Sequence, residues 1–310
     1  MDKKILLAVD DSSPSKAALA YAAKMSTQIP GLTYVLLHVQ PMVSLYLREE
    51  ATKKASARRL IDTIGVKNAA FSRGLLDTYR QEMEKSGIAA QRIETKTQPR
   101  HLGVAKDIID TAQQNLYDAV VVGRRGLSGI AKLYAGSVTT NILEQSQVIP
   151  VWLVDGKVSD GGLLLAVDGS ASSLRVVDHV SFMLSGSEKS ALTLLYVANS
   201  FQNYCEIDLD EKLDPDLEDI VEQGDRACID AFYPLAMQKF KAAGIEANRI
   251  HFETITGRRR IGKAIVDFAQ KGNFSTVVVG RRGMDKSFFM GSVSRYLINK
   301  LGDGALWVVP

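Results

Sequence analysis

Two glycine-rich stretches of this chain have the composition of anion-binding loops. GRRGLSGIAKLYAGS begins at Gly123 and GRRGMDKSFFMGS begins at Gly280, and each starts with G-R-R-G and ends with G-S. Glycines let backbone N–H groups approach an oxyanion, and a following helix N-terminus adds unpaired donors and a positive dipole end. Ser137 or Ser292 would add a hydroxyl donor. The pattern is typical of a phosphate site, although the same glycines could form only a strand-to-helix turn with the serine as an N-cap.

The glycine pattern occurs twice because the whole chain repeats itself. KILLAVDDS contains Asp10 and corresponds to GLLLAVDGS, which contains Asp168. VLLHV ends at Val39 and TLLYV ends at Val197, with the same offset along the chain. Because order, spacing and residue type agree from end to end, we infer one module of about 150 residues that has been duplicated.

The duplication predicts two domains. They comprise residues 1–155 and 162–310, are joined by a short polar linker rich in glycine, and are each long enough to bury a core. In each copy, apolar strand-like runs such as KILLAV alternate with amphipathic helical segments such as VAKDIIDTAQQ. This alternation predicts an α/β fold made of two tandem doubly wound Rossmann-like domains, each a five-stranded parallel sheet flanked by helices.

The chemistry-bearing residues fall at the ends of the expected strands. Asp10 and Asp168 close the first strands, Val39 and Val197 close the second, and the glycine loops close the fourth. Ligands of open α/β sheets bind beyond these carboxyl ends. A dinucleotide fingerprint is absent after the first strand, and a near match to a P-loop at Gly257 has alanine in place of the Mg²⁺-binding Ser/Thr.

Three motifs together resemble those of the universal stress protein family: V-D-x-S after strand one, L-L-x-V in strand two and G-x2-G-x9-G-S after strand four. The resemblance covers nearly the whole chain as two tandem domains. For the ATP-binding branch of the family, it implies that the aspartate and the valine hold adenine, while the glycine loop and serine hold ribose and phosphates. It implies ATP, or AMP or ADP, as the ligand, with Mg²⁺ if a triphosphate binds. The implied nucleotide site of the first domain is Asp10, Val39, Gly123, Gly126, Gly136, Ser137 and Val138.

The second copy keeps the ends of the motif but not its length. Only seven residues separate Gly283 from Gly291, whereas nine separate Gly126 from Gly136. Two fewer residues must shorten or reshape the loop over the phosphates. We therefore expect the first domain to bind nucleotide and the second to be degenerate. The second site implied by the resemblance is Asp168, Val197, Gly280, Gly283, Gly291 and Ser292.

Each G-x-x-G also encloses two arginines, Arg124 with Arg125 and Arg281 with Arg282, where the family more often has small or polar residues. Cations are unfavourable near a helix N-terminus by up to about 1 kcal/mol. Either these side chains lie on a solvated face with carboxylate partners, or they bind a strongly anionic ligand such as ATP through bidentate contacts. On the second interpretation, Arg124 joins the first site. Arg100 lies before the third helix of the first copy, where the second copy has three arginines.

No catalytic residues and no metal site are predicted. The four histidines show no metal-ligand spacing, and His38 and His251 are expected to pack within strands. Three functions remain open: a nucleotide-binding stress-response or signalling protein, a ligand-free interaction scaffold, or an enzyme using ATP or a flavin-like cofactor. Slow ATP hydrolysis is compatible with the first, since a bound triphosphate needs only a positioned water.

Partners and location are constrained only coarsely. The net charge of +3 does not favour nucleic acid, and no run of about 18 apolar residues predicts a membrane span. With two cysteines and no signal-peptide pattern, we expect a cytoplasmic protein. The apolar fifth strands, VWLV and LWVV, favour an internal pseudo-dimer of the two copies, and a homodimer remains open. The insertions at 40–60 and 199–219 differ most between the copies.

Overall fold

The computed structural model describes residues 2–124, 137–198, 215–256, 260–282 and 290–310. The chain forms two compact units, and the main division between them falls between Val151 and Trp152. Within the described residues, no helix is long and apolar enough to cross a membrane.

Unit 1 contains a parallel sheet with the strand order β3-β2-β1-β4. β1 and β4 are continuous apolar runs because they lie in the interior of the sheet and are covered on both faces. The strands are β1 (Lys3–Ala8), β2 (Leu32–Gln40), β3 (Ile93–Pro99) and β4 (Ala119–Gly123).

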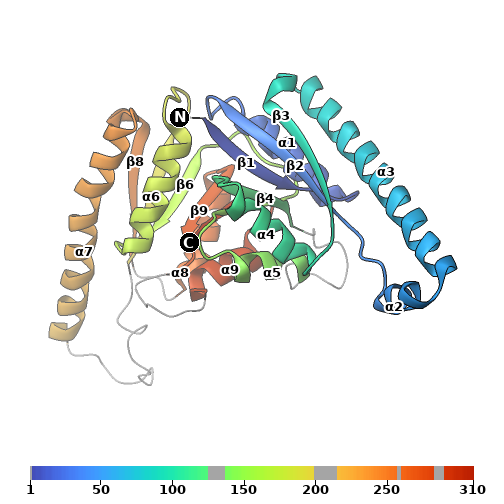
Figure 1. Ribbon diagram of the computed structural model, residues 1–310. Coiled ribbons are helices and arrows are strands. Elements are labelled where there is room, and N and C mark those ends of the chain that lie inside the picture. Colours follow the sequence, from blue (N-terminus) through green and yellow to red (C-terminus); the bar gives the residue numbers. More distant parts are fainter. Residues whose placement is uncertain (1, 125–136, 199–214, 257–259, 283–289) are drawn as a thin grey trace. The chain divides into compact units, whose positions relative to one another are not determined.

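Helices cover both faces of this sheet: α1 and α3 lie on one face, and α4 and α5 on the other (Figure 1). Ser12 caps α1, and Pro14 lies in its first turn, where both residue types are favoured. Gly87 follows the end of α3 with a positive φ of 91°, a conformation that favours glycine. The helices are α1 (Ser13–Met25), α2 (Leu45–Lys53), α3 (Ala55–Lys85), α4 (Val104–Gln114) and α5 (Ser137–Gln145), with a 3₁₀ turn at Ala90–Arg92.

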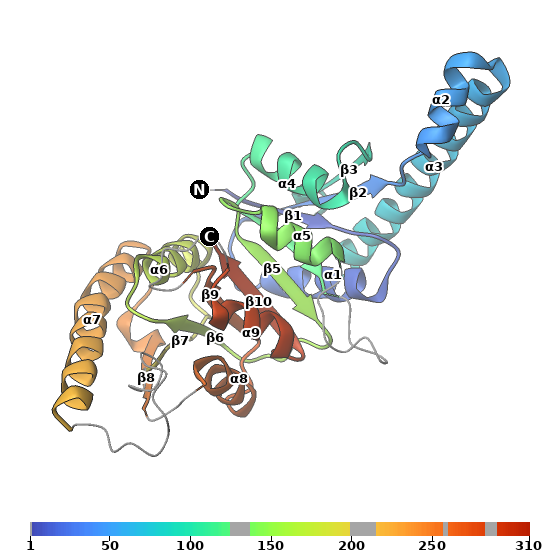
Figure 2. The same cartoon turned by 90° about the horizontal axis from the view of Figure 1, so that it is seen from below.

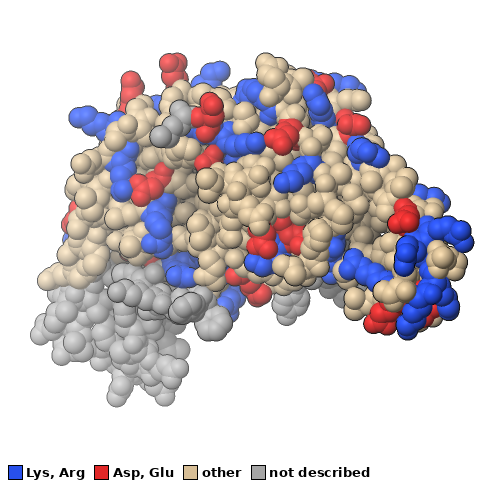
Figure 3. Space-filling model, in the orientation of Figure 1, with Lys and Arg blue, Asp and Glu red and all other residues tan. Residues whose placement is uncertain are grey.

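The insertion after β2 forms a helical hairpin of α2 and the long helix α3. No residue of α2 is buried, and the hairpin extends away from the sheet (Figure 2). Leu45 and Tyr46, at the start of α2, are exposed. Lys and Arg gather on this hairpin (Figure 3). Its exposed basic residues include Arg48, Lys53, Lys54, Arg58 and Arg59.

Unit 2 repeats the architecture with the strand order β5-β10-β9-β6-β7-β8. The pairs β10–β9, β9–β6, β6–β7 and β7–β8 are parallel. Helices α6 and α7 cover one face, and α8 and α9 cover the other. The strands are β5 (Val151–Asp155), β6 (Leu163–Val167), β7 (Leu192–Val197), β8 (Ile250–Ile255), β9 (Thr276–Gly280) and β10 (Gly304–Val309), and the helices are α6 (Ala171–Leu184), α7 (Pro215–Ala242), α8 (Ile261–Lys271) and α9 (Ser292–Lys300), with a 3₁₀ turn at Ala247–Arg249. The predicted α/β fold of two tandem doubly wound copies is confirmed.

Two aromatic residues meet where β5 lies beside β10 (Figure 2). The ring of Trp152 stacks on that of Trp307, and the Trp152 Nε1–H donates to Nε2 of His179 at 3.2 Å. Nε2 of His179 accepts this hydrogen bond, and desolvation lowers the pKa of the imidazole to about 3. His179 is therefore a neutral, partly buried residue.

The two histidines that lie in strands, His38 and His251, differ in burial. His38 is buried in β2, as expected. His251 is exposed, so the expectation that it packs within the sheet is wrong. β8 is the edge strand of unit 2, and four of its six residues are exposed, which periodicity alone does not reveal.

Candidate functional site

A cavity of about 280 Å³ opens at the carboxyl edge of the unit 1 sheet. Its volume is near the lower end of small-molecule sites, about 300–1,000 Å³. The ends of β1, β2 and β4 meet there with the first turns of α1, α4 and α5. Four of the predicted site residues line it: Asp10, Val39, Gly123 and Val138. The remaining lining includes apolar walls from Pro41, Val104, Ile108 and Ile142.

Asp10 supplies the carboxylate of the cavity. Ser15 Oγ donates to its Oδ1 at 2.7 Å, and the Ser12 hydroxyl donates to the same oxygen. Tyr79 Oη donates to the Asp10 carbonyl at 2.9 Å, which ties the end of β1 to α3. Both serine hydroxyls use Oδ1, so Oδ2 is left as an acceptor for a ligand hydroxyl or amino group.

His38 lies beside this carboxylate in a defined tautomer. Its Nδ1 lies 2.8 Å from Ser72 Oγ, and Ser72 Oγ donates to the Asn68 carbonyl at 2.8 Å. Because the serine proton is already donated, His38 Nδ1 must carry the proton that it shares with Ser72. Burial lowers the pKa of His38, and the nearby Asp10 opposes this shift only in part. The imidazole is therefore neutral at pH 7.

The first glycine of each loop is required by packing. A Cβ atom on Gly123 would overlap the backbone carbonyl of Pro14, in the first turn of α1. A Cβ atom on Gly280 would overlap the hydroxyl of Ser172, at the corresponding place in α6. Both glycines thus allow the end of a strand to approach the start of a helix closely. This agrees with the interpretation that they form a strand-to-helix turn.

The rest of the first loop is described only in part. Gly126 and Gly136 lie outside the described residues. Ser137 is the first residue of α5, so the N-terminus of this helix is at the cavity, where Val138 and Thr139 line the wall. A helix N-terminus presents unpaired N–H donors and the positive end of the dipole.

Arg124, the residue after Gly123, is almost fully buried. Its side chain is 5% exposed, and Arg124 is not among the described residues that line the cavity. Its counterpart Arg281 is 4% exposed. The backbone N–H of Arg281 donates to the Val309 carbonyl at 2.6 Å, which anchors the end of β9 to β10. Neither Arg124 nor Arg281 lies on a solvated face, so that alternative is wrong for these two residues.

Arg100 is the cavity arginine that sequence reasoning did not select. It follows the last residue of β3 and lines the cavity. Its Nε is buried and makes no hydrogen bond to any described residue. The sequence feature that could have identified Arg100 as a site residue was its position at the carboxyl end of a strand, just before a helix.

The second copy repeats the aspartate network. Ser173 Oγ donates to Asp168 Oδ1 at 2.7 Å, and the Ser170 N–H donates to the same oxygen at 3.1 Å. Val197 ends β7, in the place that Val39 has near the end of β2. The amino-terminal half of the motif is therefore built alike in both copies.

The second loop begins and ends as its sequence predicts. Gly280 ends β9, and Gly291 N–H donates to the Arg281 carbonyl at 2.9 Å. Ser292 is the first residue of α9. Gly283 and the shortened span lie outside the described residues.

This fold, with a cavity at the carboxyl edge of a doubly wound parallel sheet, defines the class of α/β proteins that bind small ligands at that edge. The sequence profile of the universal stress protein family matches residues 1–155 and 162–302. The chain belongs to the universal stress protein family.

Individual relatives support this assignment. A universal stress protein of Mycolicibacterium smegmatis is 25% identical over 179 residues, which cover 56% of this chain and 57% of that protein. The universal stress protein YxiE of Bacillus subtilis is 26% identical over 156 residues, 50% of this chain and 99% of that protein. This chain therefore matches little more than half of the Mycolicibacterium protein but nearly all of YxiE.

A solved structure shares the fold over the full chain. The universal stress protein from Archaeoglobus fulgidus DSM 4304 superimposes with a TM-score of 0.68, covering 99% of this chain and 97% of that one at 20% identity. At this identity, the similarity shows the common fold alone.

Proposed function

We propose that this protein binds an adenine nucleotide in the unit 1 cavity and acts as a stress-response or signalling protein. The observation that carries the proposal is the convergence of Asp10, Val39, Gly123 and Val138 on one cavity at the carboxyl edge of the sheet. These residues are far apart in sequence, and each was expected at a nucleotide site.

The chemistry of the walls supports an orientation for the ligand. The phosphates lie at the N-terminus of α5, where backbone N–H groups and the helix dipole favour anions. Asp10 accepts a hydrogen bond from a ribose hydroxyl or a base amino group. The base lies against the apolar side chains near the end of β2 and the start of α4, namely Val39, Pro41, Val104 and Ile108.

The proposal also specifies the ligand, the domain that binds it and the rate of its hydrolysis. ATP is the ligand, with AMP and ADP as alternatives, and Mg²⁺ accompanies a triphosphate through its phosphate oxygens. Unit 1 holds the main site, since the loop of the second copy is two residues shorter between Gly283 and Gly291. Hydrolysis of ATP, if it occurs, is slow, and the protein works in the cytoplasm.

The two copies pair through β5 and β10 as an internal pseudo-dimer. The stacked Trp152 and Trp307 support this, because they occupy corresponding positions in the two fifth strands. The domain boundaries, 1–155 and 162–310, follow the repeat in the sequence.

The decisive experiment is mass spectrometry of small molecules released from the purified protein, with their stoichiometry, followed by calorimetric titration with ATP. We expect one nucleotide per chain. Gly136→Asp should abolish binding, whereas the matched variant Gly291→Asp should leave it unchanged. Equal binding at two sites would refute the asymmetry. A protein that neither carries nor takes up nucleotide would be a scaffold.

A further inference from the structure

Arg100 lines the cavity beside β3, whereas Gly123 lines it at the end of β4. Arg100 follows β3, and β3 is separated from β4 by two strands in the order β3-β2-β1-β4. With adjacent strands about 4.8 Å apart, the two strand ends are about 14 Å from each other. A ligand whose anionic group lies at α5, beyond β4, therefore presents its other end to Arg100.

The Arg100 side chain has unused hydrogen-bond donors. Its Nε is buried without an acceptor, and its guanidinium group makes no hydrogen bond or ion pair within the described part of the chain. A buried donor without a partner costs about 1–3 kcal/mol. Val104 and Ile108 line the same region, so an acceptor brought by a ligand would bind in a poorly hydrated environment.

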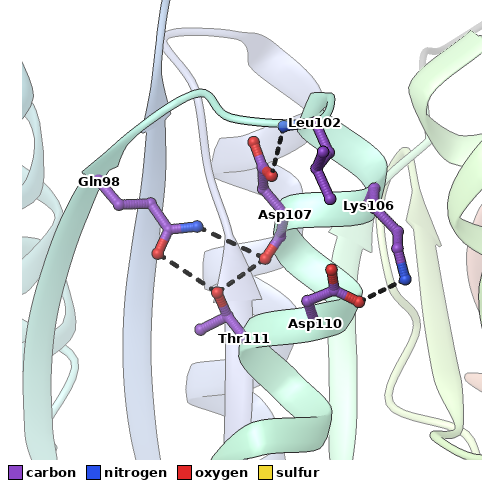
Figure 4. Close-up of polar contacts among 6 residues, drawn as sticks. All are labelled: Gln98, Leu102, Lys106, Asp107, Asp110 and Thr111. Carbon is purple, nitrogen blue, oxygen red and sulfur yellow. Dashed lines mark hydrogen bonds and ion pairs between the residues drawn. The ribbon is translucent and has the colours of Figure 1, made fainter.

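The loop that carries Arg100 is held by a buried carboxylate. Asp107, in α4, is 5% exposed, and its carboxylate accepts hydrogen bonds from the backbone N–H groups of His101 at 2.8 Å and Leu102 at 3.0 Å. Thr111 Oγ1 donates to the Asp107 carbonyl at 2.7 Å, and Gln98 at the end of β3 contacts the same cluster (Figure 4). The carboxylate thus fixes the backbone beside Arg100 and does not neutralise its charge.

The sequence of the second copy lacks the positioning carboxylate. α4 and α8 have the same length and carry the same surface ion pair, Lys106–Asp110 in one and Lys263–Asp267 in the other. At the position of Asp107, however, α8 has Ala264, and by the same alignment Gly257, which three arginines follow, stands in place of Arg100. The two helices therefore keep the same surface ion pair but differ at the residue that, in α4, holds the preceding loop.

We propose that Arg100 donates a charge-assisted hydrogen bond to a ring nitrogen of the bound base, and that Asp107 is the positioning residue that holds Arg100 in place. The inference rests on the proposed function, because it requires a nucleotide with its phosphates at α5. The positioning carboxylate has no counterpart in the second copy, where Ala264 stands in place of Asp107. The asymmetry of the two sites then has a second cause besides loop length.

The test is titration of AMP, ADP and ATP into the full-length protein and its Arg100→Ala variant. We expect affinity to fall by the same factor for all three ligands, about 10- to 100-fold, the size of one lost hydrogen bond to a charged group. Arg100→Lys should recover part of the loss. A loss that grows with the number of phosphates would overturn the proposal in favour of a phosphate contact, and unchanged affinity would overturn it outright.

Asp107→Ala tests the positioning role against a matched control on the same helix. We expect Asp107→Ala to weaken the binding of all three ligands, whereas Asp110→Ala, which breaks only the surface pair with Lys106, should leave their affinities unchanged.

The melting temperature without nucleotide shows whether Arg100 is structural. Arg100→Ala should keep or raise this temperature, since the substitution removes an unsatisfied donor. A melting temperature that falls would mean that Arg100 is structural. If the wild-type protein binds no nucleotide, the proposed function itself fails, which is a different result from any variant effect.

Discussion

The indole ring of Trp152 lies face to face with that of Trp307, with ring centroids 3.9 Å apart and planes 1° from parallel. Trp152 belongs to the first repeat by sequence and Trp307 to the second, yet both contribute to unit 2. The His179 ring lies edge-on to both indoles, at 6.0 and 5.6 Å. Two fully buried indoles and the imidazole of His179 thus join β5, β10 and α6.

Truncation of either tryptophan should destabilise unit 2 strongly. We expect Trp152→Ala and Trp307→Ala each to lower the free energy of unfolding by about 3–5 kcal/mol. The double variant should lose less than the sum, because the ring–ring contact of about 0.5–1.5 kcal/mol is removed only once. Urea unfolding measures this, with the exposed Tyr46→Ala as a control expected within about 0.5 kcal/mol of wild type. Strict additivity would show that the stacking contributes nothing.

His179 should make stability depend on pH in the acid range. Burial lowers the pKa of His179 to about 3 in the folded protein, whereas an exposed histidine titrates near 6.5. The unfolded chain therefore binds the proton first. The contribution is fully present above about pH 6.5 and is lost as the pH falls toward 3, by up to about 1.4 kcal/mol per pH unit.

Comparison with His179→Gln isolates this effect from other titrating groups. Glutamine offers an oxygen acceptor to Trp152 Nε1 but does not titrate. The stability difference between wild type and variant should narrow or reverse as the pH is lowered from 7 to 4. A difference that is constant across this range would contradict a neutral buried His179.

The two loop glycines should respond unequally to the same substitution. Gly123→Ala places a Cβ atom against the Pro14 backbone carbonyl, which cannot move without shifting α1, so we expect a loss of about 1–3 kcal/mol. In Gly280→Ala, the new Cβ atom contacts the Ser172 hydroxyl first, and this hydroxyl can rotate away. The free energy of unfolding should therefore fall by less than in Gly123→Ala. Thermal unfolding of both variants checks the order. Equal losses would mean that the packing beside Pro14 adjusts as easily as the serine.

Asp10 and Asp168 occupy equivalent positions in the two copies, so the same substitution at each tests whether the two sites are unequal. Each accepts a hydrogen bond from a serine at 2.7 Å, Ser15 or Ser173, and asparagine preserves an acceptor for it. We expect Asp10→Asn to weaken ATP binding about 10-fold or more and Asp168→Asn to leave it unchanged, as measured by calorimetry. The opposite pattern would place the working site in the second copy.

Much of this protein follows from local sequence alone. The duplicated V-D-x-S, L-L-x-V and G-S segments predicted two α/β copies, and Ser12 and Gly87, residue types typical of helix ends, lie at the ends of α1 and α3. These features are determined locally because periodicity, capping and backbone conformation depend on residues within a turn or two of each other. Strand ends then predicted that Asp10 and Val39 would face one cavity.

The tertiary structure decided which residues surround that cavity and which do not. Asp107 occupies a polar position of an amphipathic helix, yet it is buried because it binds the backbone of its neighbouring loop. Arg124, selected for its place in the glycine loop, is buried and does not line the cavity, whereas Arg100 does. His251 is exposed because β8 is an edge strand, and Trp152 meets Trp307 because β5 lies beside β10. Such outcomes depend on contacts between residues far apart in the chain, which local propensity does not encode.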